Sequence, residues 1–82
     1  MSDQFEAAAK HVRELKKEQV TEEVGLRLYS LYKQATEGPN QRPEPSSLDF
    51  AAHKKWKAWK VLGALPKEEA KQQYIAEANK FK

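Results

Sequence analysis

The sequence contains no cysteine among its 82 residues. Disulfide bonds, thiolate metal sites and cysteine nucleophiles are therefore excluded together, and a reducing compartment is the expected environment. The sequence also has no apolar run long enough to cross a bilayer, and residues 1–4 lack the basic and apolar regions of a signal peptide. We therefore expect a cytoplasmic protein without stable membrane insertion.

The chain has little excess of charge, with 15 basic and 12 acidic residues and a formal net charge of +3. Eighty-two residues predict a single domain, 1–82, whose core is too small to enclose a large active site. The net charge is too low for general nucleic-acid binding. However, five lysines and no acid lie between Ala51 and Lys67. This local positive field favours an anionic partner at that place.

Apolar residues recur at helical spacing in four segments, and none alternates as a strand does. Thr21 and Asp49 are the expected N-caps of the second and third helices, which Gly38 and Gly63 terminate. The predicted helices span residues 3–16, 22–37, 50–62 and 66–81. The predicted fold class is therefore all-α, a four-helix bundle with a long loop between helices 2 and 3.

That loop, residues 38–49, holds three of the four prolines and cannot be regular secondary structure. A loop of this length is unusual in so small a domain. Short loops force successive helices to be antiparallel, whereas a long crossover allows them to be parallel. We therefore expect the second and third helices to be able to run in the same direction.

The second and third helices carry the residues that indicate a function. On the second helix, Leu28, Leu31 and Ala35 form a stripe that faces the core. A separate stripe, half apolar and half cationic, is formed by Leu26, Tyr29 and Lys33. On the third helix the predicted packing residues are Trp56, Trp59 and Leu62. Lys55 lies at the edge of that packed face, while a solvated face is expected for Lys54, Lys57 and Lys60. Aromatic rings beside lysines suit an anion that carries a base ring.

Two motifs resemble those of the acyl-CoA-binding protein family. Residues 29–38 read Tyr-x-x-Tyr-Lys-Gln-Ala-Thr-x-Gly, and residues 55–59 read Lys-Trp-x-Ala-Trp. The resemblance extends over nearly the whole chain. It implies four helices with the long loop between the second and third, and a protein that binds long-chain fatty acyl-CoA thioesters without catalysing a reaction.

The resemblance also implies roles for individual residues. It implies that the ribose 3′-phosphate is bound by Tyr29, Lys33 and Lys55. It places the adenine ring on Tyr32, a further ligand contact at Tyr74 and the acyl chain near Leu26. The residue just before Leu26, which is large and apolar in the family, is Gly25 here.

Besides an intracellular acyl-CoA carrier, the sequence leaves three other interpretations: an enzyme, a nucleic-acid-binding module and a helix-bundle interaction module. An enzyme needs a nucleophile, a base and an orienting group close together, and the serines have no histidine at an informative spacing. We therefore expect no catalysis, no cofactor and, because His11 and His53 are far apart in sequence, no metal site.

A nucleic-acid module could use the lysines of residues 54–60 with Trp56 and Trp59 as stacking rings. A helix-bundle interaction module would use the fold alone. The preferred interpretation is a monomeric carrier whose partner is a long-chain acyl-CoA.

Overall fold

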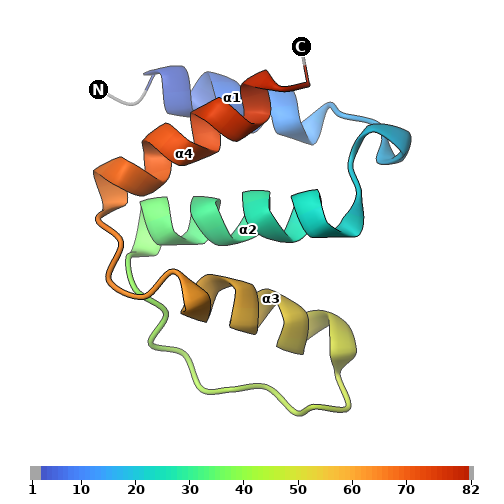
Figure 1. The fold of residues 1–82 in the computed structure, drawn as a ribbon, viewed down its shortest axis with the longest axis vertical. Helices are drawn as coiled ribbons and strands as arrows, with labels where there is room; N and C mark the ends of the chain where they lie inside the picture. The colour runs from blue at the N-terminus through green and yellow to red at the C-terminus, as the bar shows by residue number, and fades with distance from the viewer. Residues whose placement is uncertain (1–2, 82) are drawn as a thin grey trace.

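Four α-helices form the protein in a computed structural model that describes residues 3–81, apart from the side chains of Asp3 and Lys17 (Figure 1). A short 3₁₀ turn, Lys17–Gln19, precedes the second helix. The helices are α1 (Asp3–Arg13), α2 (Glu22–Glu37), α3 (Phe50–Val61) and α4 (Lys67–Asn79). No strand occurs within residues 3–81. The predicted all-α class is confirmed.

The ends of α2 and the start of α3 follow from local side-chain chemistry. The Thr21 side chain accepts a hydrogen bond from the backbone N–H of Val24, at 3.2 Å, and caps α2. Gly38 ends α2 with φ of 87°, a left-handed value that glycine adopts without a steric penalty. Asp49 Oδ1 accepts from the backbone N–H of Ala52 at 3.3 Å and caps α3. These predicted boundaries are confirmed.

The first helix is shorter than predicted, because α1 ends at Arg13 and not at residue 16. The N–H groups of Glu14 and Leu15 bond to carbonyls three residues back, at 3.1 Å each, and this tightens the last turn. The Lys16 N–H then donates to Gln19 Oε1 at 3.0 Å. A side chain thus takes the donor that would have extended the helix.

The fourth helix is also shorter than predicted. It begins at Lys67, with Pro66 as its N-cap, and ends at Asn79. The N–H groups of Lys80 and Phe81 bond to carbonyls three residues back, at 3.2 and 3.1 Å, so the final turn is again tightened.

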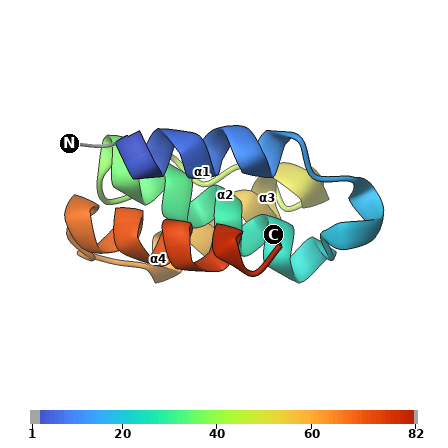
Figure 2. The same ribbon diagram turned by 90° about the horizontal axis from the view of Figure 1, so that it is seen from above.

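Helix α2 is the centre of the arrangement. It packs against α4 and α3, and α1 packs against α4. Figure 1 shows α2 and α3 running in the same direction, as the long loop allows, with α1 and α4 on the side of α2 away from α3. Figure 2, seen from above, shows α1 and α4 running alongside each other. Within the described residues α1 and α3 make no contact with each other. They therefore flank α2 and leave part of its surface open between them.

The core stripe predicted on α2 is buried. Leu28, Leu31 and Ala35 pack with apolar residues of α4 and α1, namely Ala70, Tyr74, Ala78, Phe5, Ala8 and Ala9. Trp59 is buried too, as predicted, with only 2% of its surface exposed. Trp56 is only half-buried, so its predicted place in the core is wrong. It packs the loop onto α3 instead.

Hydrogen bonds fasten the long loop to α3. The indole N–H of Trp59 donates to the Gly38 carbonyl at 2.9 Å, and that of Trp56 donates to the Arg42 carbonyl at 2.8 Å. The buried Asn40 side chain donates to the Trp56 carbonyl at 3.0 Å. Both tryptophans therefore fasten the loop to α3.

Candidate functional site

Three hollows follow one another along α2 and are linked by Tyr29 and Tyr32. The middle one, which we call the apolar hollow, is lined by Ala9, Val12, Arg13, Val20, Gly25, Leu28, Tyr29, Tyr32 and Tyr74. It shares Tyr32 with the basic cleft, lined by Phe5, Glu6, Ala7, Ala9, Lys10, Arg13, Tyr32, Ala35, Thr36, Lys67 and Lys71. It shares Tyr29 with the loop hollow, lined by Tyr29, Arg42, Pro43, Pro45, Asp49, Ala51, Ala52, Lys55, Trp56 and Trp59.

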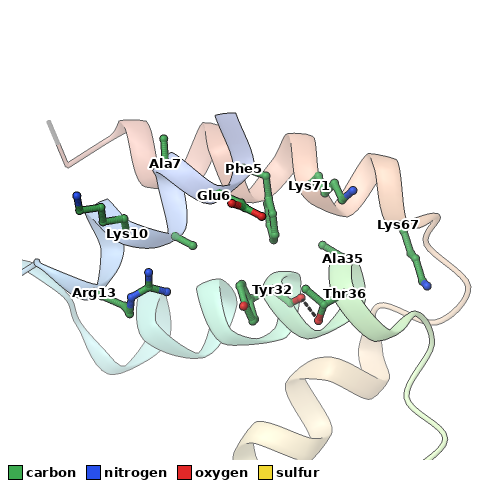
Figure 3. Close-up of a pocket in the computed structure, with 11 residues that line it drawn as sticks. Phe5, Glu6, Ala7, Lys10, Arg13, Tyr32, Ala35, Thr36, Lys67 and Lys71 are labelled. Atoms are coloured by element: carbon green, nitrogen blue, oxygen red, sulfur yellow. Dashed lines mark hydrogen bonds between the residues drawn. The ribbon is translucent and has the colours of Figure 1, made fainter. Parts of the chain in front are cut away.

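The basic cleft is the largest of the three, with a volume of about 810 Å³. Figure 3 shows its side chains, which come from α1 above, α2 below and α4 behind. Four of them are cationic, and one, Glu6, is acidic; the cations are Lys10, Arg13, Lys67 and Lys71. The cleft therefore has a positive field that attracts anions.

Tyr32 belongs to a cluster of three aromatic rings contributed by three helices. Its ring lies nearly parallel to that of Phe5, with centroids 5.6 Å apart and an interplanar angle of 17°. Tyr74 tilts against both, at 5.8 Å from Tyr32 and 5.2 Å from Phe5. Tyr32 remains 37% exposed. The cluster holds the Tyr32 ring in place at the rim, where it keeps surface available to a flat partner.

Tyr74 lies deeper than its predicted role suggests. It is 3% exposed and belongs to the hydrophobic core, yet it also lines the apolar hollow. Burial raises the pKa of the Tyr74 hydroxyl above its usual value, and the neighbouring Tyr32 adds to the rise. The hydroxyl is therefore neutral at physiological pH and can donate a hydrogen bond.

Lys55 and Tyr29 are brought together across the seam between α2 and α3. The Lys55 ammonium lies 5.4 Å from the centre of the Tyr29 ring, a cation–π distance. Tyr29 is half-buried, whereas Lys55 is exposed. Two of the predicted phosphate ligands are thus neighbours at the loop hollow.

Lys33 lies one helical turn beyond Tyr29 and already has an anionic partner. Its ammonium lies 2.6 Å from Glu37 Oε2 and 5.6 Å from the centre of a Trp59 ring. Arg42 also reaches Glu37, at 2.9 Å. The hydrogen bond from Lys33, followed by that from Arg42, lowers the pKa of the Glu37 carboxyl. In this structure the Lys33 ammonium is therefore paired with the Glu37 carboxylate.

Leu26 does not join the tyrosines. It lines a separate hollow of about 290 Å³ between α2 and α3, together with residues such as Ala58, Val61 and Leu62. This fourth hollow shares no lining residue with the other three. The structure thus pairs Tyr29 with Lys55 and Tyr32 with Tyr74, while Leu26 lines a different hollow.

Sequence reasoning missed the cations of the basic cleft. Arg13 follows Phe5 and Ala9 at helical spacing, so its place on that face of α1 could have been inferred. Lys67 and Lys71 gave no comparable signal, because their position depends on how α4 packs against α2. Arg13 is the most notable omission, since it lines both the basic cleft and the apolar hollow.

The environments of the tryptophans and histidines bear on the other interpretations. Trp59 is buried and therefore displays no open ring for stacking on bases, while the half-buried Trp56 is hydrogen-bonded to the loop. His11 Nε2 lies 3.2 Å from the Phe81 carbonyl, His53 Nε2 lies 2.6 Å from Glu44 Oε2, and both histidines are half-buried. Among the described residues, no three metal-ligating side chains are grouped together. No described helix is long and apolar enough to cross a membrane.

The fold and these hollows define a helical binding domain with a cationic and aromatic surface beside an apolar one. The chain belongs to the acyl-CoA-binding protein family: the family's sequence model, described as "Acyl CoA binding protein", matches residues 2–78. The resemblance inferred from the two motifs is therefore confirmed.

Known relatives agree with this assignment. The chain is 55% identical over 71 residues to enoyl-CoA delta isomerase 2 of Rattus norvegicus, covering 87% of this chain and 18% of that protein. It is 53% identical over 58 residues to acyl-CoA-binding domain-containing protein 1 of Arabidopsis thaliana, covering 71% and 17%. The chain thus spans less than a fifth of the length of these curated relatives.

A solved structure supports the fold as well. The crystal structure of Oryza sativa acyl-CoA-binding protein 2 superimposes with a TM-score of 0.92 at 35% sequence identity. The match covers 98% of this chain and 88% of that one. The four-helix arrangement predicted from the sequence is therefore the family's fold.

Proposed function

We propose that this chain binds long-chain fatty acyl-CoA thioesters and acts as a cytoplasmic acyl-CoA carrier. The observation that carries the proposal is that the three hollows adjoin, because they share Tyr29 and Tyr32 as lining residues and so place cationic side chains, an exposed tyrosine ring and apolar surface side by side. A fatty acyl-CoA joins phosphates, an adenine ring and an alkyl tail in one molecule. Membership of the family supports the same class of ligand.

The head group is proposed to bind where α2 faces α1 and α3. Lys33, Lys55 and the Tyr29 hydroxyl are the proposed ligands of the ribose 3′-phosphate, because ammonium and phenol groups form charge-assisted hydrogen bonds with phosphate. The adenine ring is proposed to stack on Tyr32, a contact that contributes about 1 to 3 kcal/mol. Tyr74 is proposed as a further contact from α4. The closeness of Lys55 to Tyr29 and the exposed rim position of Tyr32 support these roles.

The alkyl tail is proposed to supply most of the affinity. At about 0.8 kcal/mol per methylene, burial of roughly ten methylenes contributes about 8 kcal/mol before the costs of ordering the ligand. The charged head then fixes the orientation of the ligand. Because the bound tail is held out of water, the concentration of free acyl-CoA thioester stays low, as expected of a carrier.

Binding without chemistry is proposed to be the whole activity of this chain, as a monomer. The match covers only 18% of the rat enoyl-CoA delta isomerase 2, so the isomerase activity in that name is not transferred here. The preference for long acyl chains, the monomeric state and the cytoplasmic location are parts of the proposal.

Calorimetric titration tests the ligand class. Hexadecanoyl-CoA and a short single-stranded oligonucleotide would each be titrated at about 50 and 200 mM salt. We expect a saturable one-to-one complex with hexadecanoyl-CoA, a negative heat-capacity change from apolar burial and a small salt dependence. Oligonucleotide binding that weakens steeply with salt, together with no saturable heat from the thioester, would favour the nucleic-acid interpretation and overturn the proposal.

A further inference from the structure

Large apolar side chains are exposed at both ends of α3. Among residues 3–81, four large hydrophobic residues are exposed, and one of them, Tyr32, belongs to the candidate site. The other three lie at α3, where Leu48 is 84%, Phe50 71% and Val61 82% exposed. Apolar residues scattered singly over a surface need no explanation, but a group of them at one helix indicates an interaction surface.

Helical spacing places two of these residues on one line with two lysines. The four positions are separated by four, three and four residues, which puts them on the same face of a helix. All four are exposed, whereas Trp59, on the opposite face, is buried. The stripe is apolar at both ends and cationic in the middle. We call these four residues the α3 stripe: Phe50, Lys54, Lys57 and Val61.

The α3 stripe stays exposed although α3 has a neighbour on each side. Within the described part of the chain, α2 is the only helix that packs against α3. The long loop is fastened to α3 through Trp56 and Trp59, and Figure 1 shows α3 lying between α2 and this loop. One ion pair reaches the stripe, from Lys54 Nζ to Glu22 Oε2 at 2.7 Å. The rest of the stripe is open to a partner.

The surroundings of the stripe are positively charged. Residues 51–67 contain five lysines and no acid. Lys57 forms no ion pair with any residue that the structure describes. Lys60, next to the stripe, donates to the Asn40 carbonyl at 3.4 Å and not to a carboxylate. The stripe therefore presents positive charge that favours an anionic partner.

This mixture of side chains favours a lipid surface over a protein or a nucleic acid. The core of a protein interface is depleted of lysine, whereas lysines occupy the middle of the stripe. A nucleic acid attracts lysines but offers little to the side chains of Leu48 and Val61. An amphipathic helix on an anionic bilayer uses both features, because its lysines contact phosphates while its apolar side chains enter the boundary between head groups and acyl chains.

We propose that the α3 stripe, together with Leu48, docks this chain on the surface of an anionic bilayer. Lys54 and Lys57 contact lipid phosphates, and the apolar side chains at the two ends enter the interfacial layer without crossing the bilayer. Phe50 and Val61 are about 16 Å apart along the helix, so the two anchors hold α3 parallel to the surface. This docking does not depend on the proposed function, because it needs no acyl-CoA.

Co-sedimentation with vesicles tests the proposal on the whole chain in the absence of acyl-CoA. Vesicles of phosphatidylcholine alone are compared with vesicles that also contain about 30% phosphatidylserine, at about 50 and 200 mM salt. We expect binding to the anionic vesicles to be at least about tenfold stronger than to the neutral ones, and to weaken as salt is added.

Single substitutions locate the docking surface. One elementary charge near an anionic surface changes the affinity about fivefold, so Lys57→Glu should weaken vesicle binding by more than about tenfold. Lys16→Glu makes the same change of charge at an exposed position outside α3 and should weaken binding by about threefold or less. Phe50→Ser should weaken binding by about threefold or more, whereas Phe50→Leu, which keeps an apolar anchor, should stay within about twofold of wild type. Circular dichroism checks that each variant folds.

A fluorescent label reports contact with lipid directly. The chain has no cysteine, so one label can be placed at a chosen position. An environment-sensitive fluorophore on Val61→Cys should shift to the blue when anionic vesicles are added. The same fluorophore on Gln72→Cys, at an exposed position of α4, should not shift. This measurement decides the question even if a charge variant fails to fold.

Three results would overturn the proposal. The first is a wild-type chain that does not bind anionic vesicles, which would leave a protein as the partner of the stripe. The second is an equal loss of vesicle binding in Lys57→Glu and Lys16→Glu, and the third is a label at position 61 that does not respond while vesicles bind. Acyl-CoA binding in solution is measured separately, so the failure of this proposal and the failure of the proposed function are distinguishable.

Discussion

Tyr29 and Tyr32 are three residues apart on α2, yet their rings have different surroundings. Tyr29 lies beneath the Lys55 ammonium at 5.4 Å. Tyr32 lies beside Phe5 and Tyr74 in the aromatic cluster and keeps 37% of its surface exposed. The first setting favours a contact through the hydroxyl to an anion, and the second favours a contact through the ring face.

These settings predict opposite responses to the loss of a hydroxyl. Tyr32→Phe should leave the affinity for acyl-CoA nearly unchanged, whereas Tyr32→Ala should weaken binding by about 1 to 3 kcal/mol because the stacking surface is removed. Tyr29→Phe should cost about 1.5 to 3 kcal/mol through the loss of a hydrogen bond to phosphate. Calorimetry on the three variants tests this. Equal losses for Tyr29→Phe and Tyr32→Phe would refute the two roles.

Lys33 is predicted to act through the ribose 3′-phosphate of the ligand. Lys33→Ala should weaken binding of intact acyl-CoA by about 1.5 to 3 kcal/mol, and the loss should shrink with the dephospho ligand, because each change removes one side of the same contact. Lys57→Ala, on the exposed outer surface of α3, serves as the control and should change affinity by only tenths of a kcal/mol, since its charge is screened. Full additivity of the two deletions would remove Lys33 from the site.

We predict that Glu37 competes with the phosphate of the proposed ligand for Lys33, because the two side chains form an ion pair at 2.6 Å. Because its pKa is lowered by Lys33 and Arg42, the carboxylate stays charged from neutral pH down into the acidic range, and it releases both cations only as the pH falls through that lowered pKa. Glu37→Gln should therefore strengthen acyl-CoA binding at neutral pH by roughly two- to fivefold, the range of an exposed ion pair. The gain should vanish in the Lys33→Ala background. Weaker binding of Glu37→Gln would instead mean that the carboxylate helps by positioning the lysine.

At the scale of the helices, the buried side-chain amide of Gln34 joins α2 to the turn between α3 and α4. Gln34 is fully buried, and its Nε2 donates to the carbonyls of Gly63 at 3.0 Å and Leu65 at 2.8 Å. Those two carbonyls follow the end of α3. The amide therefore sets where α3 stops relative to α2, and with it the position of Lys55.

Gln34→Leu should lower the free energy of unfolding by about 1 to 3 kcal/mol, because it keeps much of the volume but removes two hydrogen bonds, to the carbonyls of Gly63 and Leu65. Urea unfolding followed by tryptophan fluorescence measures the change. Gln72→Leu, at an exposed position on α4, is the matched control and should have little effect. Similar stability of both variants would show that the amide is not an important link.

Element boundaries were predictable where a local residue sets them. Thr21, Asp49 and Gly38 act through contacts within a few residues, so the start and end of α2 and the start of α3 follow from the sequence. The end of α1 depends on the Gln19 side chain, which takes a backbone donor. The position of Leu26 could not be predicted, because helical spacing places it on the stripe of Tyr29 but does not say how α2 turns toward α3.

At the scale of the whole molecule, the chain is a flat body of 35 × 30 × 14 Å. Because α1 and α3 flank α2 without touching, the hollows open along one surface instead of forming an enclosed pocket. The residues predicted for the charged and aromatic contacts, on α2, α3 and α4, therefore lie close together only after folding. The residues of the basic cleft, contributed by α1, α2 and α4, illustrate this best.

The most direct test of the account compares the affinity of the wild-type chain for hexadecanoyl-CoA and for free CoA at one salt concentration. Both ligands share the head group, so the difference measures tail burial alone. The account predicts that the thioester binds more than a hundredfold more tightly, since roughly ten buried methylenes contribute several kcal/mol. Affinities within a factor of about ten, or 1.4 kcal/mol, would contradict the account, because the chain would then bury no tail.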